Sequence, residues 1–324
     1  MRRLTLSMIV TWGMIGMWAA SVGGASLDDA QDASKLRRFE YSQIHMGVAV
    51  RITLYTETEA EAESAAKAAY ARFAELEQVM SDYRPTSEIM VALSKAHREP
   101  VPVSRDLYRV LRRALDIAEA SDGAFDPTVG PLVSLWREAR RSGALPTSEA
   151  IAAAKEKVGW RYVQLDSRTR TMRITREGVR VDFGGIAKGD ACDQAIQVLR
   201  NLGVARASVE SGGDIHFLGS PPGSSGWLVS ILNRQGRMIL ADKAISTSGD
   251  AEQFVEIGGV RYSHIVDPKT GLGLTNRLQA SVIANSGLTT DPLATALCVM
   301  GEEASRELVR KYRVRAFFVR PKEG

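Results

Sequence analysis

A glycine-rich stretch in the middle of the chain, Val181 to Asp193, carries residue types that suit a phosphate-bearing ligand beside a metal. Met172 to Val181 alternates apolar and polar residues, which predicts a strand, and a helical apolar pattern follows as far as Gly203. A turn that joins a strand to a helix N-terminus leaves N–H groups that favour an anion. Lys188 adds a positive charge and Asp182 adds a carboxylate. The alternative is a tight turn that only packs a helix onto a sheet.

A second candidate is the pair Asp291 and Thr295, which lie four residues apart and therefore share one helix face. Pro292 fits the first position of a helix, which makes Asp291 the expected N-cap. A carboxylate and a hydroxyl, completed by backbone carbonyls and water, form an oxygen-only set that suits Mg²⁺. The alternative is that Asp291 only caps its helix while Thr295 bonds back to its own backbone.

His264 is one of four histidines and precedes a turn marked by Asp267, Pro268 and Gly271. Its imidazole can exchange protons near neutral pH, so a histidine aimed by a rigid turn suits a catalytic base. A lone histidine is more often a packed polar group, and both interpretations stay open.

An irregular loop from Ala124 to Leu132 follows a predicted helix, and Asp126 in this loop can turn its carboxylate inward to bind a ligand or to cap the turn. Met46, Tyr83 and Phe125 are soft or aromatic residues at loop boundaries, where such side chains belong to the core more often than they stack on a ligand.

The elements that must position these residues alternate irregularly between helix and strand, with few regular βαβ crossovers, which predicts an α+β fold. Helices are expected over Thr58–Met80 and Glu88–Ala96 and after the caps Ser104 and Thr147, and a second helix follows the one at Asp291. The expected extended segments are a strand within Phe39–Thr56, hairpins within Trp160–Ile174 and Val255–Tyr262, Ala205–Leu218 interrupted at Gly212-Gly213, a strand after a hairpin loop at Pro221–Gly226, Gln279–Ala284 and Val314–Val319.

The composition is that of a globular protein: among 324 residues, 44% are hydrophobic and 25% are charged. This length allows one large domain or two interlocked ones. The formal charge is +4, and removing Arg2 and Arg3 with an export segment leaves 40 basic against 38 acidic residues. Since the balance is almost neutral and no basic run is interleaved with aromatic residues, the sequence does not indicate nucleic-acid binding.

The N-terminus, residues 1–25, resembles an export signal. Two arginines precede an apolar run from Leu6 to Ala20, and Gly23 and Ala25 offer a cleavage site. An uncleaved membrane anchor is the alternative, although the apolar run is short for a membrane span. A polar and mobile lead-in is expected over residues 26–40, before a single domain over residues 41–324. No cysteine lies near the cleavage site, so no lipid anchor is expected there.

The two cysteines, Cys192 and Cys298, fall on apolar faces of predicted helices. Buried free thiols are therefore expected, although an exported protein could pair them. No group of cysteine and histidine has the spacing of a zinc site.

Taken together, these stretches resemble the ApbE family, the FAD:protein FMN transferases, from about Met46 to Phe318. Each block that carries the resemblance is weak alone, but their common order along the chain is specific. The blocks are Met46-Gly47, Ala124-Phe125-Asp126, Asp182 to Asp193, Gly212-Gly213-Asp214, His264 to Gly271 and Asp291 to Leu297.

The resemblance implies an exported, Mg²⁺-dependent enzyme that binds FAD, transfers its FMN half to a threonine hydroxyl of a target protein and releases AMP. It also implies a T-fold-like arrangement of mixed sheets packed with helices, with FAD and Mg²⁺ in a central cleft. By motif, the expected FAD contacts are Met46, Tyr83, Ala124, Phe125, Asp126, Asp182, Lys188 and Ile265. The expected Mg²⁺ ligands are Asp291, Thr295 and the carbonyl of Gly185, and His264 is the expected base.

Three positions depart from the family pattern: Val48 stands where a threonine is usual, Asp190 where an aromatic residue is usual and Ala251 where a tyrosine is usual. These departures bear on substrate fit, since the metal and base positions are intact. An FAD pyrophosphatase, in which water replaces threonine, and a non-catalytic periplasmic FAD-binding protein remain as alternatives. The resemblance implies a soluble periplasmic protein whose acceptor is a membrane electron-transfer subunit or a flavin-carrying reductase.

Overall fold

The computed structural model describes residues 35–230, 237–250 and 253–320. The expected signal peptide and most of the expected lead-in therefore lie outside the described residues, as does Ala251. Within the described ranges, no helix is both long and apolar enough to cross a membrane.

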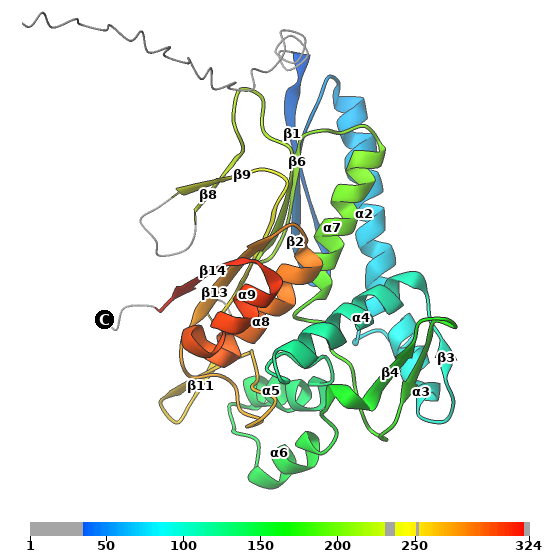
Figure 1. The fold of residues 1–324 in the computed structure, drawn as a ribbon, viewed down its shortest axis with the longest axis vertical. Helices are drawn as coiled ribbons and strands as arrows, with labels where there is room; N and C mark the ends of the chain where they lie inside the picture. Colours follow the sequence, from blue (N-terminus) through cyan, green and yellow to red (C-terminus); the bar gives the residue numbers. More distant parts are fainter. Residues whose placement is uncertain (1–34, 231–236, 251–252, 321–324) are drawn as a thin grey trace, which may run out of the picture.

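A seven-stranded antiparallel sheet forms the centre of the fold (Figure 1). Its strand β2 carries Val50, Ile52 and Leu54, which alternate with more polar residues and are fully buried, as expected for a strand that covers a core with one face. In spatial order the strands are β1 (Arg37–His45), β2 (Val48–Thr56), β6 (Ala207–Ser211), β7 (Asp214–Leu218), β10 (Ala244–Ser248), β13 (Gln279–Ala284) and β14 (Arg315–Val319).

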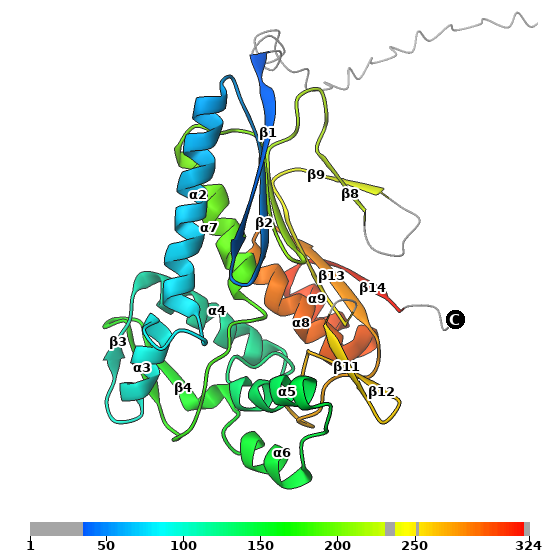
Figure 2. The ribbon, with the colours of Figure 1, turned by 180° about the vertical axis from the view of Figure 1, so that it is seen from behind.

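Three helices cover one face of this sheet and pack on one another in the order α2 (Glu59–Met80), α7 (Ala187–Asn201) and α8 (Gly287–Ala304) (Figure 2). The main apolar core lies between these helices and the sheet. The opposite face carries a two-stranded sheet, β8 (Trp227–Ser230) and β9 (Arg237–Leu240), over a smaller apolar cluster. Helices and largely antiparallel sheets are thus segregated into layers, which confirms the predicted α+β class.

The remaining elements gather mostly at one end of the helical layer (Figure 1). They are α3 (Glu88–Ala96), β3 (Val101–Pro102), α4 (Arg105–Ala120), α5 (Gly130–Ser142), α6 (Ser148–Lys155), a 3₁₀ turn (Trp160–Tyr162), β4 (Val163–Asp166), β5 (Thr171–Ile174), β11 (Phe254–Ile257), β12 (Val260–Ser263) and α9 (Arg306–Tyr312). Two helices begin at the predicted caps, since the side chains of Ser104 and Thr147 accept from backbone N–H groups. At the start of α2, Thr58 and Glu61 form a capping box. Such caps each contribute about 1 kcal/mol.

The strand predicted within Phe39–Thr56 is confirmed as β2, but the chain reverses at Met46 and Gly47, so that a second strand, β1, precedes it. Both turn residues have positive φ (51° and 77°), the backbone that a two-residue hairpin requires. The strand β1 already begins at Arg37, inside the expected lead-in, because its partly buried Phe39 and Tyr41 pack on the core. The reversal brings Met46 to the wall of the main cavity.

The predicted strand from Met172 to Val181 is also too long. The strand β5 ends at Ile174, and a turn at Gly178 (φ 81°) follows, so that only an isolated bridge at Arg180 precedes the glycine turn. The predicted helix after the glycines is correct, since α7 begins at Ala187. The expected hairpin loop at 221–226 instead connects two different sheets, because β8 pairs with β9 and not with β7.

Asp291 is not the N-cap of its helix. The helix α8 begins one turn earlier, at Gly287, and Pro292 lies inside it. The N-terminus is capped from another helix: the carboxylate of Asp193 on α7 accepts from the Ser286 hydroxyl (2.6 Å) and from the backbone N–H groups of Gly287 (2.6 Å) and Leu288 (3.0 Å). A local sequence pattern cannot reveal a cap that lies 94 residues away.

The N-terminal turns of α7 and α8 cross at two glycines. A Cβ added to Gly189 would lie 2.3 Å from the carbonyl oxygen of Gly287, and one added to Gly287 would lie 2.3 Å from that of Gly189. Real Cβ contacts are not this short, so both positions require glycine. The close approach lets the Gly189 N–H donate to the Asp291 carboxylate at 3.1 Å.

We predict that Gly189→Ala separates the two helices and lowers the free energy of unfolding by about 1–3 kcal/mol, the usual cost of overpacking, measured by urea titration. The exposed Gln197→Ala on the same helix is the control and should change the free energy by less than about 0.5 kcal/mol. A Gly189→Ala protein as stable as the wild type would show that the crossing is not tight.

A second prediction concerns the cap. Asp193→Ala removes the acceptor of four donors, since His216 Nδ1 also lies 2.6 Å from this carboxylate. Because hydrogen bonds to a charged group are the stronger kind, stability should fall by at least about 2 kcal/mol in thermal denaturation. Ser286→Ala, which loses one hydroxyl donor, should cost only about 1 kcal/mol. Equal losses in the two variants would contradict the assignment of Asp193 as the cap of α8.

Candidate functional site

A cavity of about 990 Å³ opens where the sheet meets α5, α7 and α8. It is lined by every residue for which the sequence predicts a role in binding or catalysis. These residues are Met46, Tyr83, Ala124, Phe125, Asp126, Asp182, Gly185, Lys188, His264, Ile265, Asp291 and Thr295.

At the rim, Asp182 and Tyr83 are linked by Arg137 of α5. Oδ1 of Asp182 accepts from the Gly184 N–H (2.7 Å) and Oδ2 from Arg137 (2.9 Å), while Arg137 also binds Asp82 (2.7 Å). The guanidinium lies 4.4 Å from the centroid of the Tyr83 ring, and the Tyr83 side chain is otherwise exposed. Burial raises the pKa of Asp182, and Arg137 opposes that rise. Arg137 therefore holds both Asp182, which binds the glycine turn, and the Tyr83 ring at the rim of the cavity.

Deeper in the cavity, Lys188 lies between two buried carboxylates. Its Nζ is 3.2 Å from Asp214 Oδ2 and 3.7 Å from Asp291 Oδ2, and it donates to the Gly184 carbonyl at 3.1 Å. Burial, reinforced by the charge of Asp214, raises the pKa of Asp291 to about 7, although Lys188 opposes the rise. Burial acts to lower the pKa of Lys188, but the two carboxylates outweigh it and raise that pKa. The ammonium of Lys188 is thus shared by the carboxylates of Asp214 and Asp291, and the cluster contains more acidic than basic groups.

The oxygen atoms beside Asp291 suit a hard cation. The Thr295 hydroxyl lies 3.2 Å from the Ser248 hydroxyl, and the backbone of Gly185 packs so closely that a Cβ there would lie 2.9 Å from Thr295 Oγ1. Within the described ranges, no three acidic, histidine or cysteine side chains form a metal-binding group. A cation here would rely on one carboxylate together with hydroxyl and carbonyl oxygens, which Mg²⁺ accepts, and the donor set fits that ion.

His264 follows β12 directly and is partly buried. The carbonyl oxygen of Gln253 lies 3.1 Å from the His264 backbone nitrogen and 3.0 Å from Nδ1. A carbonyl can only accept, so Nδ1 carries the ring proton and Nε2 is left as the basic nitrogen. Burial lowers the pKa of His264, and the charges of Arg140 and Lys188 add to this effect. The imidazole is therefore neutral near pH 7.

Asp126 uses its carboxylate to organise its own loop. Oδ1 accepts from the Thr128 N–H (2.8 Å) and hydroxyl (2.6 Å), and Oδ2 accepts from the Trp160 N–H (2.9 Å). The inward turn of this side chain agrees with its predicted capping alternative. Both oxygens are engaged by the protein, so a ligand would meet this loop through its backbone, Ala124 and the ring of Phe125.

For several residues at or near the cavity, the sequence alone predicts no role. Ser248 and Arg137 have no local signal, because only the fold brings them to the cavity. Asp214 belongs to the glycine-rich block Gly212-Gly213-Asp214. This block indicates part of the site, but it does not predict the ion pair of Asp214 with Lys188. Of the departures from the family pattern, Val48 lines the cavity, whereas Asp190 is fully buried outside it and is paired with Arg109 of α4 (2.8 Å).

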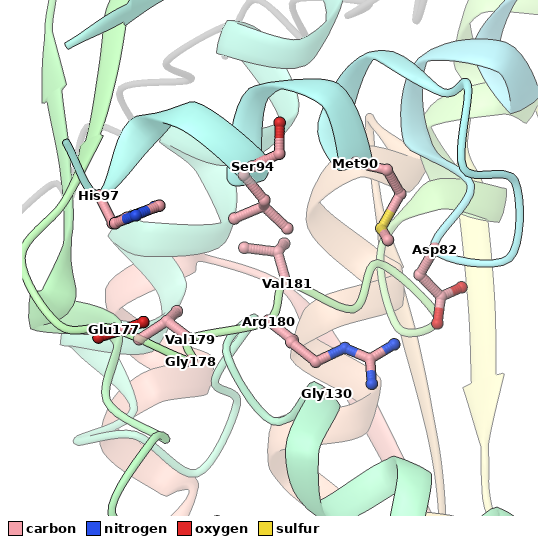
Figure 3. A pocket seen from close by; sticks show the side chains of 11 residues that line it. Asp82, Met90, Ser94, His97, Gly130, Glu177, Gly178, Val179, Arg180 and Val181 are labelled. Atoms are coloured by element: carbon pink, nitrogen blue, oxygen red, sulfur yellow. The ribbon is translucent and has the colours of Figure 1, made fainter. Parts of the chain in front are cut away.

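A second, smaller cavity of about 350 Å³ lies next to the first, and Asp82 borders both. Figure 3 shows Met90 and Ser94 of α3 and His97, which follows this helix, on one side of it and the segment from Glu177 to Val181 on the other. None of the residues with a predicted role lines this smaller cavity. The larger one is therefore the candidate active site.

Comparison with known proteins bears on this site. The ApbE family model matches residues 46–318. Among curated relatives, the FAD:protein FMN transferase of Treponema pallidum (strain Nichols) is 32% identical over 311 residues, which cover 89% of this chain and 86% of the relative. That of Vibrio cholerae (serotype O1, strain ATCC 39541) is 36% identical over 239 residues, 71% of each chain.

Solved structures agree in fold. The flavin transferase ApbE from Vibrio cholerae superposes with a TM-score of 0.79 at 31% identity, covering 87% of this chain and 93% of that one. The apo form of the Pseudomonas stutzeri flavinyl transferase ApbE gives a TM-score of 0.78 at 27% identity, covering 89% and 92%. Family model, relatives and structures all extend over most of the described fold, and the chain belongs to the ApbE family.

Proposed function

We propose that this protein is an FAD:protein FMN transferase that requires Mg²⁺, moves the FMN half of FAD to a threonine hydroxyl of a target protein and releases AMP. One observation carries the proposal: a single cavity joins the neutral imidazole of His264, the ammonium of Lys188 and the oxygen set around Asp291. Transfer from a diphosphate to a hydroxyl needs these three kinds of group, namely a proton acceptor, fixed positive charge and a place for a cation.

In the proposed reaction, the threonine oxygen forms a bond to the phosphorus of the FMN phosphate. The bond between that phosphorus and the bridging oxygen breaks, and the electron pair leaves with AMP. Nε2 of His264 takes the hydroxyl proton, since Nδ1 is held by Gln253. Lys188 offsets charge on the phosphoryl oxygens.

The metal would be held by Asp291, Thr295 and the Gly185 carbonyl. When bound, Mg²⁺ supplies positive charge that stabilises the phosphoryl oxygens. FAD would contact Met46, Tyr83, Ala124, Phe125, Asp182 and Ile265, together with the backbone of Asp126. The cavity, at about 990 Å³, is at the upper end of the roughly 300–1,000 Å³ usual for small-molecule sites, which suits a dinucleotide.

We propose that the protein acts after export, in the periplasm, because its first 25 residues have the pattern of a cleaved signal. Its acceptor would then be a membrane electron-transfer subunit or a flavin-carrying reductase. Fractionation of cells followed by N-terminal sequencing of the mature protein tests the location.

The test of the function is to incubate the purified protein with FAD, Mg²⁺ and a threonine-containing acceptor, and to measure in-gel flavin fluorescence and released AMP. A fluorescent acceptor with equal AMP is expected. His264→Asn should lower the transfer rate by about 10²–10⁴-fold, the usual contribution of general base catalysis, while FAD affinity is retained. AMP without a labelled acceptor would indicate a pyrophosphatase instead, and neither product would indicate an FAD-binding protein without turnover.

We also predict that Asp291→Ala abolishes the dependence of activity on Mg²⁺, because it removes the only carboxylate of the proposed oxygen set. Titration of MgCl₂ into the FAD complex, followed by calorimetry, should lose its binding signal in this variant. Asp166→Ala, an exposed change at the end of β4, is the matched control and should bind Mg²⁺ like the wild type. An unchanged Mg²⁺ response in Asp291→Ala would place the metal elsewhere.

A further inference from the structure

The hairpin β11–β12 aims the proposed base. Its terminal pair is Phe254 with Ser263, and the next residues on the two strands are Gln253 and His264. The hydrogen bond from the His264 N–H to the Gln253 carbonyl therefore continues the ladder by one step, and the bond from Nδ1 goes to the same oxygen. The orientation and the tautomer of His264 consequently depend on the register at this end of the hairpin, which lies beside α5 (Figure 2).

Arg261 of β12 holds this end of the hairpin. Its Nε lies 2.8 Å from Asp250 Oδ2, and its Nη2 lies 2.6 Å from the Asp250 carbonyl oxygen. The same guanidinium lies 3.3 Å from the centroid of the Phe254 ring, across the hairpin. The Asp250 side chain is only 6% exposed, and Arg261 is the cation that meets this buried carboxylate. Neither Arg261 nor Asp250 lines the cavity, and a direct contact with FAD does not explain them.

We propose that Arg261 is a positioning residue: by tying Asp250 and the Phe254 ring to β12, it keeps the Gln253 carbonyl on both His264 donors, so that Nε2 faces the acceptor hydroxyl. This inference rests on the proposed function for the role of Nε2, but its geometric part does not. A planar guanidinium suits the task, because it can bind two oxygens and cover a ring at once, which an ammonium cannot do.

The charges that face His264 come from three elements. Burial is the largest cause that lowers its pKa, and Arg140 of α5 and Lys188 of α7 add to it, while the hydrogen bond to the Gln253 carbonyl and the charge of Asp250, beyond β10, raise it. In the wild type, the basic form therefore persists below the ordinary histidine value, and activity should be lost only as the pH falls through that lowered pKa. Loss of Arg261 should loosen the contact between Nδ1 and the Gln253 carbonyl, a contact that raises the pKa of His264, so this pKa should fall further and the acid limb should move to lower pH.

The kinetic test compares Arg261→Met and Arg261→Lys with the wild type and with Arg112→Met, a surface control whose ion pair with Asp116 lies on α4. Arg261→Met should lower kcat by about 10- to 100-fold, the usual effect of a misplaced catalytic group, with an unchanged KM for FAD. Its acid limb should move to lower pH. Arg261→Lys keeps the charge but not the two-oxygen geometry, so it should also reduce kcat and shift the acid limb in the same direction, each to a smaller extent. Wild-type kcat and pH profile in Arg261→Met would overturn the proposal.

A second measurement does not need turnover. Nitrogen NMR of histidine-labelled protein should show His264 with its proton on Nδ1 and none on Nε2, in a spectrum of only four histidines. His264→Asn assigns the signal. Arg261→Met should give a mixture of tautomers, whereas Arg112→Met should not. If the wild type shows the expected tautomer but makes no flavinylated acceptor, the positioning stands and the proposed function fails; a proton on Nε2 in the wild type refutes the positioning itself.

Discussion

The site depends on the crossing of α7 and α8 at Gly189 and Gly287. Lys188 comes from α7 and Asp291 from α8, and they share a charge cluster only because two backbones meet where no side chain fits. Asp193 fixes this crossing by capping α8 from α7. The N-terminal part of α7, which carries the Lys188 ammonium, therefore also anchors α8, which carries the Asp291 carboxylate. The two groups cannot be moved independently.

Two environments within one cavity shift acid–base groups in opposite directions. Burial and the neighbouring Asp214 raise the pKa of Asp291, which marks a place where a cation is favoured. Burial and nearby cations lower the pKa of His264, which keeps a neutral base available. Groups whose surroundings separate their pKa values in this way are typical of a catalytic site, since acid–base and electrostatic roles need different protonation states.

The sequence predicted the fold class, most helices and the set of residues around the cavity, because ordered blocks of glycine, aspartate and histidine carry both the spacing and the family resemblance. Prediction from the sequence failed where the structure of a segment depends on a residue that is distant along the chain. The start of α8 was placed too late because its cap, Asp193, lies on another helix. The strand predicted before the glycine turn is too long, because apolar and polar residues continue to alternate past Ile174 although the hydrogen-bonded β-ladder ends there. Arg137 and Ser248 were missed since only tertiary structure gives them a role.

The ion pair between Asp190 and Arg109 has an evolutionary consequence. Asp190 stands where the family pattern usually has an aromatic residue. Here its buried carboxylate is paired with the guanidinium of Arg109 on α4. Arg109 cannot be exchanged alone, because Asp190 would remain as a buried charge without compensation, whereas Arg109 would keep its ion pair with Asp106 if Asp190 were replaced. The dependence between the two positions, 81 residues apart, should therefore run one way: lineages with an aspartate at the first should keep the arginine at the second.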